Sequence, residues 1–327
     1  MTSHLGDALR PTALMGQILG DEGKRPGVVA EAVARLAGEG FYRGFGVRPV
    51  AEAADRRRIA GIVRGGDLRL TYWLTLMLND EGLSLASCDP ALRKRSVERA
   101  RENLPAVAEC GTTYVGIGSG PDPGPDLRAE ATERLIESMA DLAQAAWDAG
   151  EMHLMIEPFD RGAHKNGLIG PTPEAVGVLR RLREHHANVC ISWDAAHAAL
   201  NGEDVCESLA LAAPYVAQIH FANAVLDRDD AGFGDHHMPL GPPGFLDVEK
   251  GADLLAAAER AGLFNGDVGL AAEMGTPPDG DPWQTESAGR RFLQEVWDLY
   301  LSGGPDTSGV RVRRTRGGEE GFSGKGA

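Results

Sequence analysis

The chain has 327 residues, 43% of them hydrophobic, which is enough to build one large globular domain or two ordinary ones. Its formal net charge of −15 repels the phosphates of nucleic acids and of anionic lipids, so a general nucleic-acid-binding protein is not expected. No run approaches the roughly 18 consecutive apolar residues of a membrane span, and residues 1–20 lack a basic stretch before an apolar core, so we expect a cytoplasmic protein without a membrane partner.

Short apolar runs that favour strands alternate with longer segments of helical periodicity, and the alternation never changes to hairpins. Strands are predicted at residues 12–19, 41–47, 68–76, 112–117, 153–157, 189–194, 216–221 and 268–273. Helices are predicted at residues 28–37, 51–63, 90–109, 128–149, 173–184, 204–212, 248–261 and 285–301. Asp247 and Thr172 stand where N-caps belong, and Gly40 stands where a helix should end. This alternation predicts a parallel sheet.

Eight strand–helix units in about 300 residues fit a single-domain (β/α)8 TIM barrel, which needs roughly 250 residues. The alternative is a doubly wound open sheet. However, the first strand–helix junction contains no GxGxxG, and the glycine run at residues 116–120 gives only weak support for a phosphate site. We therefore predict a catalytic barrel over residues 1–303. After Leu301 the composition changes to Gly, Ser, Thr and charged residues, so we expect residues 304–327 to be a disordered tail.

The chain has four cysteines, and no two of them form a CxxC pair. This spacing offers neither a zinc knuckle nor the disulfide framework of a small secreted domain. We expect reduced, mostly buried thiols at Cys88, Cys110, Cys190 and Cys206.

Polar residues occur at the ends of four consecutive predicted strands. The run HLMIEPFD carries Glu157, VCISWDAAH carries Asp194 with His197 three residues on, VAQIHFAN carries His220, and VGLAAEM carries Glu273. In a (β/α)8 barrel the carboxyl ends of the strands meet at the functional face. Three carboxylates brought together there would repel one another without a cation. Oxygen-rich ligation with one imidazole suits Mn²⁺, our first expectation, and also Mg²⁺, Co²⁺ or Zn²⁺.

Each of these residues also has a simple structural explanation when it is taken alone. Glu157 could end a strand before Pro158, and His220 could be a satisfied core histidine. Asp194 could be the N-cap of a helix that contains His197. We favour a metal site because all four residues occupy equivalent positions.

The connection after the seventh strand, residues 222–246, is the longest that follows a strand and contains GFGDHHMPLGPPG. Long loops at this face usually carry function. We expect Asp235, His236 and His237 to lie beside the metal, where they would bind a second ion or substrate hydroxyls. In the loop after Glu157, Lys165 and Arg161 are candidates for neutralising an anionic substrate group.

These residues resemble the xylose isomerase-like superfamily of (β/α)8 sugar isomerases and epimerases. The resemblance covers residues 10–303 and is strongest at Ile156-Glu157, Trp193-Asp194-Ala195-Ala196-His197, Ile219-His220 and Ala272-Glu273. In the ketose 3-epimerase branch, such a set binds one divalent ion. The resemblance implies that Glu157 and Glu273 are metal ligands and exchange the proton next to the substrate carbonyl, and that Asp194 and His220 are metal ligands.

Two other branches of the superfamily are relevant. Apurinic-site endonucleases have an Asp-x-His pair after strand seven, here Asp235 and His237, but their trinuclear zinc cluster needs further histidines, and no histidine occurs between His4 and His153. The large subunits of C-glycoside deglycosidases are similar in Glu157-Pro158-Phe159-Asp160 and in the segment GDHHMP at residues 234–239, which has one extra residue before the proline.

We therefore expect a divalent-metal-dependent sugar isomerase or epimerase that abstracts a proton alpha to a carbonyl. The candidate catalytic residues are Glu157, Glu273, His197 and His237, and the candidate substrate contacts are Lys165, His197, Asp235 and His237. The alternatives are a carbon–carbon lyase that cleaves a 3-keto C-glycoside and a catalytically silent sugar-binding subunit. The expected partners are a small sugar or glycoside and either further copies of the chain or a small second subunit.

Overall fold

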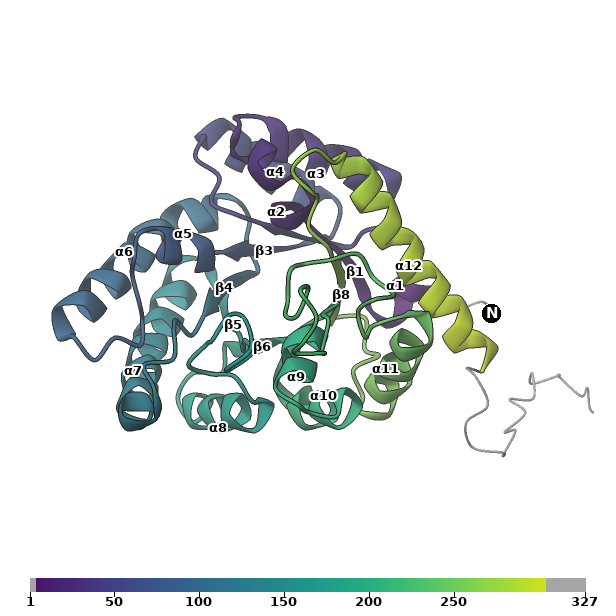
Figure 1. Ribbon diagram of the computed structural model, residues 1–327. Coiled ribbons are helices and arrows are strands. Elements are labelled where there is room, and N and C mark those ends of the chain that lie inside the picture. Colours follow the sequence, from purple (N-terminus) through teal and green to yellow (C-terminus); the bar gives the residue numbers. More distant parts are fainter. Residues whose placement is uncertain (1–3, 304–327) are drawn as a thin grey trace, which may run out of the picture.

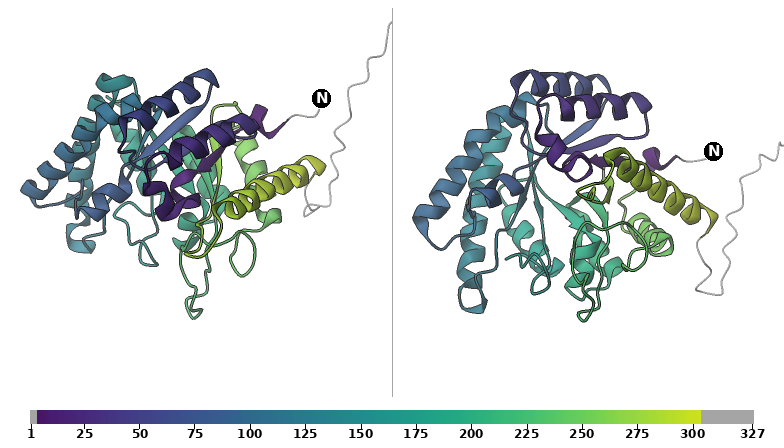
Figure 2. Two further views of the ribbon diagram at one scale, coloured as in Figure 1. Left: turned by 90° about the horizontal axis from the view of Figure 1, so that it is seen from above. Right: turned by 45° about the horizontal axis from the view of Figure 1, so that its top comes forward.

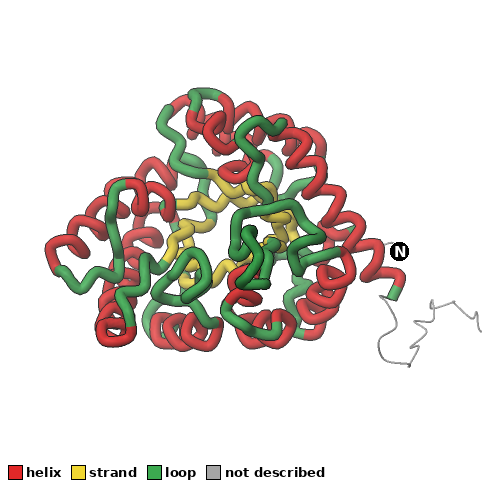
Figure 3. The backbone as a smooth tube through the Cα atoms, viewed as in Figure 1, coloured by secondary structure: helices red, strands yellow, loops and turns green. Residues whose placement is uncertain are grey.

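Eight parallel strands close into a barrel in the order β1 to β8, and helices surround it. The computed structural model describes residues 4–303, and the expected tail at residues 304–327 lies outside the described residues. Strand β1 pairs with both β2 and β8, which excludes the doubly wound open sheet. In Figures 1 and 3 the strands form an inner ring with the helices outside it, so the predicted TIM barrel is confirmed.

The strands are short, and the outer helices lie close to the predicted positions. The strands are β1 Arg10–Leu14, β2 Gly44–Val47, β3 Arg69–Trp73, β4 Tyr114–Gly118, β5 His153–Glu157, β6 Val189–Asp194, β7 Val216–Ala222 and β8 Gly269–Glu273. The helices that form the outer ring are α3 Val28–Glu39, α4 Ala53–Gly65, α6 Pro90–Glu109, α7 Pro125–Gly150, α8 Thr172–Leu182, α10 Val205–Ala212, α11 Val248–Arg260 and α12 Pro282–Ser302. Shorter helices are α1 Leu5–Ala8, α2 Met15–Ile18, α5 Thr75–Asp80 and α9 Ala195–Leu200, with 3-10 turns η1 Gly20–Lys24 and η2 Ala213–Tyr215.

The predicted first and third strands are too long, because each apolar run continues into a short helix. Strand β1 ends at Leu14, and helix α2 follows. Met15, Ile18 and Leu19 have helical spacing and are all buried, so a helical turn places them on one face toward the core. In the same way β3 ends at Trp73, and Leu78 of the following helix α5 is buried.

Two of the three predicted helix ends are confirmed. The Asp247 side chain accepts a hydrogen bond from the amide of Lys250 at 2.8 Å, which caps α11. Gly40 ends α3 with a φ of 74°, a conformation that favours glycine. The prediction for Thr172 is wrong, because this residue is already inside α8. Its amide donates to the Glu203 carboxylate, and its hydroxyl bonds to that of Ser208.

Trp73 lies inside the barrel because the neighbouring strands carry glycine. A Cβ atom on Gly116 would lie 2.3 Å from Cε3 of Trp73, and one on Gly46 would lie 3.2 Å from its Nε1. The indole ring centroid is 5.8 Å from that of His220. Trp73 therefore forms one wall of the space at the carboxyl ends of the strands.

The loops after β5 and β7 project from the same side of the barrel (Figure 2). This is the side on which the strands end, as expected for parallel strands in one barrel. No helix in residues 4–303 has the length and hydropathy needed to cross a membrane. All four cysteines are free thiols, with Cys110 and Cys190 buried and Cys88 and Cys206 half-buried.

Candidate metal centre and active site

The four residues at the strand ends meet in one buried cluster. Each contributes a ligand atom, and these four atoms lie within 4.8 Å of one another. Register explains the convergence, because Asp194 pairs with His220 across β6 and β7, and Glu273 pairs with Ala222, which follows His220 on the same face of β7. Among the described residues this is the one such group of three or more possible metal ligands, and it consists of Glu157, Asp194, His220 and Glu273.

His220 lies between the carboxylates of the cluster. Its Nδ1 atom is 2.8 Å from Oε1 of Glu157, 2.7 Å from Oε2 of Glu273 and 3.7 Å from Oδ2 of Asp194. Nevertheless, no described residue forms a hydrogen bond of acceptable geometry with this buried nitrogen. A nitrogen surrounded by carboxylate oxygens but without a hydrogen bond is what a shared cation would require.

The other ring nitrogen of His220 contacts two polar side chains of the barrel interior. Its Nε2 atom is 3.1 Å from the hydroxyl of Ser192 and 2.9 Å from the amide nitrogen of Gln218. A metal ion on Nδ1 requires the ring proton on Nε2, where the Ser192 oxygen can accept it. Ser192 therefore suits the tautomer in which Nδ1 faces the carboxylates without a proton, whereas the amide nitrogen of Gln218 is itself a donor and can pair only with an unprotonated Nε2.

Asp194 uses its two oxygens for different purposes. Oδ1 accepts a hydrogen bond from the amide of His197 at 2.9 Å and so caps helix α9, while Oδ2 faces His220. From the sequence, Asp194 could be either the N-cap of a helix or a metal ligand. The structure is compatible with both, because each uses a separate oxygen.

The charges in the cluster shift the pKa values strongly. Burial alone would lower the pKa of His220, but the carboxylates of Glu273 and Glu157 raise it well above its usual value. Burial and the two neighbouring glutamates raise the pKa of Asp194, although His197 opposes them. Burial also disfavours ionised Glu273, yet His220 holds the pKa of this carboxyl below its usual range. One imidazole thus faces three carboxylates, and a divalent cation fits this donor set.

His197 belongs to a second layer around the cluster. Its Nδ1 atom is 3.2 Å from Oδ2 of Asp160, and its Nε2 atom is 3.8 Å from Oδ2 of Asp235. Burial would lower the pKa of His197, but the charges of Asp194 and Asp160 raise it to about 9. Asp160 is fully buried and also accepts hydrogen bonds from the backbone amides of His164 and Lys165. It therefore orders the loop after β5 as well as the histidine.

The loop after β7 brings two of its three expected residues to the site. Oδ2 of the buried Asp235 is 3.3 Å from Nζ of Lys165 and 3.5 Å from Nε2 of His237. The same His237 nitrogen is 3.5 Å from Oε1 of Glu273. His236 does not lie beside the cluster, contrary to expectation. Consecutive side chains diverge here, and its exposed ring packs on His164 with centroids 4.3 Å apart.

A cavity of about 170 Å³ opens onto the cluster. Glu157, His220 and Glu273 line it, as do three of the expected substrate contacts, Lys165, His197 and His237. Its size is below the roughly 300–1,000 Å³ of sites for drug-sized ligands and suits a small sugar. Arg161, expected nearby, instead forms an ion pair with Glu174.

Sequence reasoning missed four residues of this region. Gln17 donates to Glu273, Asp160 contacts His197, and Trp73 and Arg48 line the cavity. Arg48 and Trp73 could have been found by examining every strand end, since Arg48 directly follows β2 and Trp73 ends β3. Gln17 lies within the run that was assigned to the first strand.

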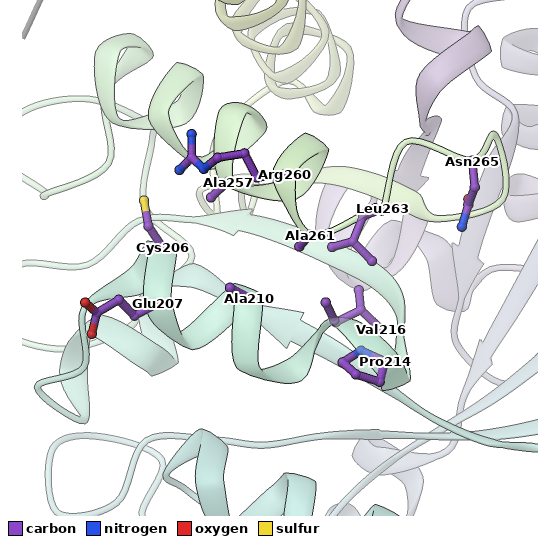
Figure 4. Close-up of a pocket in the computed structure, with 12 residues that line it drawn as sticks. Cys206, Glu207, Ala210, Pro214, Val216, Ala257, Arg260, Ala261, Leu263 and Asn265 are labelled. Atoms are coloured by element: carbon purple, nitrogen blue, oxygen red, sulfur yellow. The ribbon is translucent and has the colours of Figure 1, made fainter. Parts of the chain in front are cut away.

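A larger cavity of about 650 Å³ continues outward from the first. The two cavities share Gly16, Gln17, Arg48 and His237. A further groove of about 610 Å³ lies between α10 and α11 (Figure 4). It is lined mainly by small apolar residues and by Glu207 and Arg260, and it includes none of the cluster residues.

Comparison with known proteins identifies the family. The model of the xylose isomerase-like TIM barrel family matches residues 31–273. The chain belongs to this family. A curated relative, a probable endonuclease 4 of Thermoplasma acidophilum, is 26% identical over 127 residues, which are 39% of this chain and 41% of that protein. The chain thus matches less than half of the relative's length.

Solved structures of two sugar epimerases and of a protein with a bound zinc atom share the fold. D-Psicose 3-epimerase with D-tagatose from Clostridium cellulolyticum H10 has a TM-score of 0.63 at 14% identity, covering 90% of this chain and 99% of that one. The 3-keto-D-glucoside 4-epimerase YcjR of E. coli has a TM-score of 0.60 at 15% identity, covering 88% and 98%. The IOLI protein with a bound zinc atom has a TM-score of 0.66 at 12% identity, covering 90% and 100%.

Proposed function

We propose that this chain is a divalent-metal-dependent sugar isomerase or epimerase that abstracts a proton alpha to a carbonyl. The observation that carries the proposal is the position of Glu157 and Glu273. Their carboxylates lie 2.8 and 2.7 Å from the same His220 nitrogen, and both line the same cavity. Two carboxylates that flank one small cavity can remove a proton from one face of a carbon and return it from the other.

The other residues would hold the ion and the substrate. Glu157, Asp194, His220 and Glu273 would hold one divalent ion, with Mn²⁺ our first choice and Mg²⁺, Co²⁺ and Zn²⁺ as further candidates. When bound, such an ion polarises a carbonyl and stabilises the negative charge that develops on its oxygen. His197, Lys165, Asp235 and His237 would bind substrate hydroxyls, and Trp73 would exclude water from one side.

A second candidate is a lyase that cleaves a 3-keto C-glycoside. It begins with the same proton abstraction, but the group beta to the carbanion then leaves. The observation that favours it is the outer cavity of about 650 Å³, which has room for the aglycone of a glycoside. The similarity to a 3-keto-D-glucoside 4-epimerase in fold suggests keto-glycosides as test compounds.

Incubation in D₂O tests the proposal. The Mn²⁺-loaded chain is incubated with ketoses and 3-keto-glycosides, and products are identified by NMR and mass spectrometry. We expect deuterium at the carbon beside the carbonyl, in product or in recovered substrate. A substrate labelled at that carbon that forms product without losing or relocating the label would exclude proton abstraction there.

The two glutamates provide the second arm of this experiment. Replacing either by glutamine keeps an oxygen ligand but removes the base, so turnover should fall by a factor on the order of 10² to 10⁴. In an epimerase, Glu157→Gln and Glu273→Gln should each still exchange the proton of one epimer only. In a lyase, only one of them should affect C–H cleavage. A metal-loaded chain that binds sugars without exchange or product would instead be a silent sugar-binding subunit.

A further inference from the structure

Arg48 is a cation in the cavity that has no partner among residues 4–303. It directly follows β2, is half-buried, and lines both the inner and the outer cavity. No described residue forms a hydrogen bond or an ion pair with its guanidinium group. Asp21 and Asp80 act on it only from a distance, and Asp21 pairs with Lys24 at 2.8 Å.

The other cations of this cavity are already paired. Lys165 lies 3.3 Å from Asp235, and His197 lies 3.2 Å from Asp160. Burial lowers the pKa of Arg48. In every other described arginine whose pKa is shifted, a carboxylate partner raises the pKa, and Asp122 does so for Arg128. Arg48 nevertheless remains charged at neutral pH, because guanidinium groups do not lose their proton in proteins. A partly desolvated charge without a counterion is costly, which points to a ligand that supplies the counterion.

The position of Arg48 defines which part of a substrate it would meet. The metal cluster lies on β5 to β8, and in a closed barrel of eight strands β2 is opposite β6. A substrate whose carbonyl lies at the cluster would therefore extend its far end toward Arg48. Thr75 and Asn79, on helix α5 after the neighbouring strand β3, line the same cavity, and the buried Thr75 hydroxyl has no hydrogen-bond partner among the described residues.

Gly16 makes room for the guanidinium group. A Cβ atom on Gly16 would lie 2.8 Å from both Cγ and Nε of Arg48. The side chain of Arg48 therefore packs directly over the backbone of α2. This contact holds the guanidinium group at the junction of the two cavities.

We propose that Arg48, with Thr75 and Asn79, binds an anionic group at the end of the substrate remote from its carbonyl. The substrate class would be keto-sugars that carry a carboxylate or a phosphate, rather than neutral ketoses. Both anions present paired oxygens to the guanidinium fork. This inference rests on the proposed function, because it assumes that the carbonyl lies at the metal cluster.

Calorimetry with three matched ligands tests the inference. The Mn²⁺-loaded chain is titrated with D-fructose, with its 6-carboxylate D-fructuronate and with D-fructose 6-phosphate. We expect one anionic ligand to bind about 10- to 100-fold more tightly than D-fructose, the range for hydrogen bonds to charged groups. Which anion it is distinguishes a carboxylate site from a phosphate site.

Three variants assign the effect to Arg48. In Arg48→Gln the preference for the anion should disappear while D-fructose binding stays within about threefold. Gly16→Ala should also weaken the preference, since it displaces the guanidinium group without changing the charge. Arg43→Gln is the matched control, because Arg43 precedes β2 at the opposite end of the same strand and is exposed. It removes the same charge and should leave the preference intact.

The outcomes separate this inference from the proposed function. Equal binding of all three ligands, or a preference that persists in Arg48→Gln, would overturn the anion site, even if ketoses exchange their proton. Anion binding that depends on Arg48 without any exchange at carbon would support the anion site and overturn the proposed chemistry. The anion site would also be overturned if none of the three ligands bound the metal-loaded chain.

Discussion

Gln17 donates a hydrogen bond from Nε2 to Oε1 of Glu273 at 3.1 Å, and no described side chain donates in this way to Glu157. The two glutamates are therefore held differently, although both contact His220. Glu273 is held by Gln17 from α2 and by His237 from the loop after β7. Glu157 contacts His220 but has no such additional donor among the described side chains.

The first prediction follows from this asymmetry. Gln17→Leu keeps the size of the side chain but removes the donor, so the Glu273 carboxylate loses a hydrogen bond worth about 1.5–3 kcal/mol. Proton exchange that depends on Glu273 should slow by about 10-fold or more, while exchange that depends on Glu157 should change little. NMR of deuterium incorporation from each epimer separately measures both rates. Equal slowing from both epimers would contradict the assignment.

The second prediction concerns the ion. His220→Ala removes the nitrogen around which the carboxylates gather, so metal bound per chain should fall well below one. Elemental analysis after gentle purification measures this. His185→Ala is the control, because His185 is exposed on the outside of the barrel, after α8. Equal metal content in wild type, variant and control would show that the cluster does not hold an ion.

The third prediction separates substrate from metal. His237 touches Asp235 and Glu273 only at 3.5 Å and is a quarter exposed. His237→Ala should therefore raise KM or lower kcat while the bound metal remains. Loss of the ion in this variant would place His237 among the metal ligands.

The fourth prediction concerns pH and the metal-free fold. The folded pKa of His197 is about 9, above its ordinary value of 6.5. Protonated His197 therefore stabilises the fold fully below pH 6.5, and this stabilisation is lost as the pH rises through about 9. Asp194 acts with the same sign, because its pKa is also raised on folding.

Melting temperatures in EDTA between pH 6.5 and 9.5 provide the measurement. We expect the Tm of the metal-free chain to fall across this range. His197→Gln should give a flatter curve, since one of the titrating groups is gone. Parallel curves for wild type and variant would show that His197 does not carry this pH dependence.

Much of this structure could be predicted from the sequence, because a parallel barrel repeats one simple pattern. Buried strands give apolar runs, and a polar residue that ends such a run is conspicuous, as Glu157 and Glu273 are. The end of β1 was harder to predict, because Met15, Ile18 and Leu19 suit a buried helix and a buried strand equally well in hydropathy. Only packing against the rest of the barrel decides between these two forms.

The second layer of the site was less accessible to sequence reasoning. Asp160 and Gln17 reach His197 and Glu273 through contacts 37 and 256 residues apart in the chain, and no local pattern marks such pairs. His236 and His237 are adjacent and identical in type, yet only one faces the cluster. The backbone conformation of the loop determines which of the two side chains faces the cluster. His237 has a φ of 50°, which could not be predicted from the sequence.

The fit of Trp73 against Gly116 has a consequence for how this sequence can change. A Cβ atom on Gly116 would overlap the indole at 2.3 Å, so any larger residue at this position is harmful while the tryptophan is present. Once a smaller residue replaces Trp73, the same change at Gly116 becomes harmless or even fills the space that was left. Substitutions at the two positions can therefore occur in only one order, in which Trp73 is replaced by a smaller residue before Gly116 is replaced by a larger one. Relatives with a bulky residue at the place of Gly116 should lack the indole.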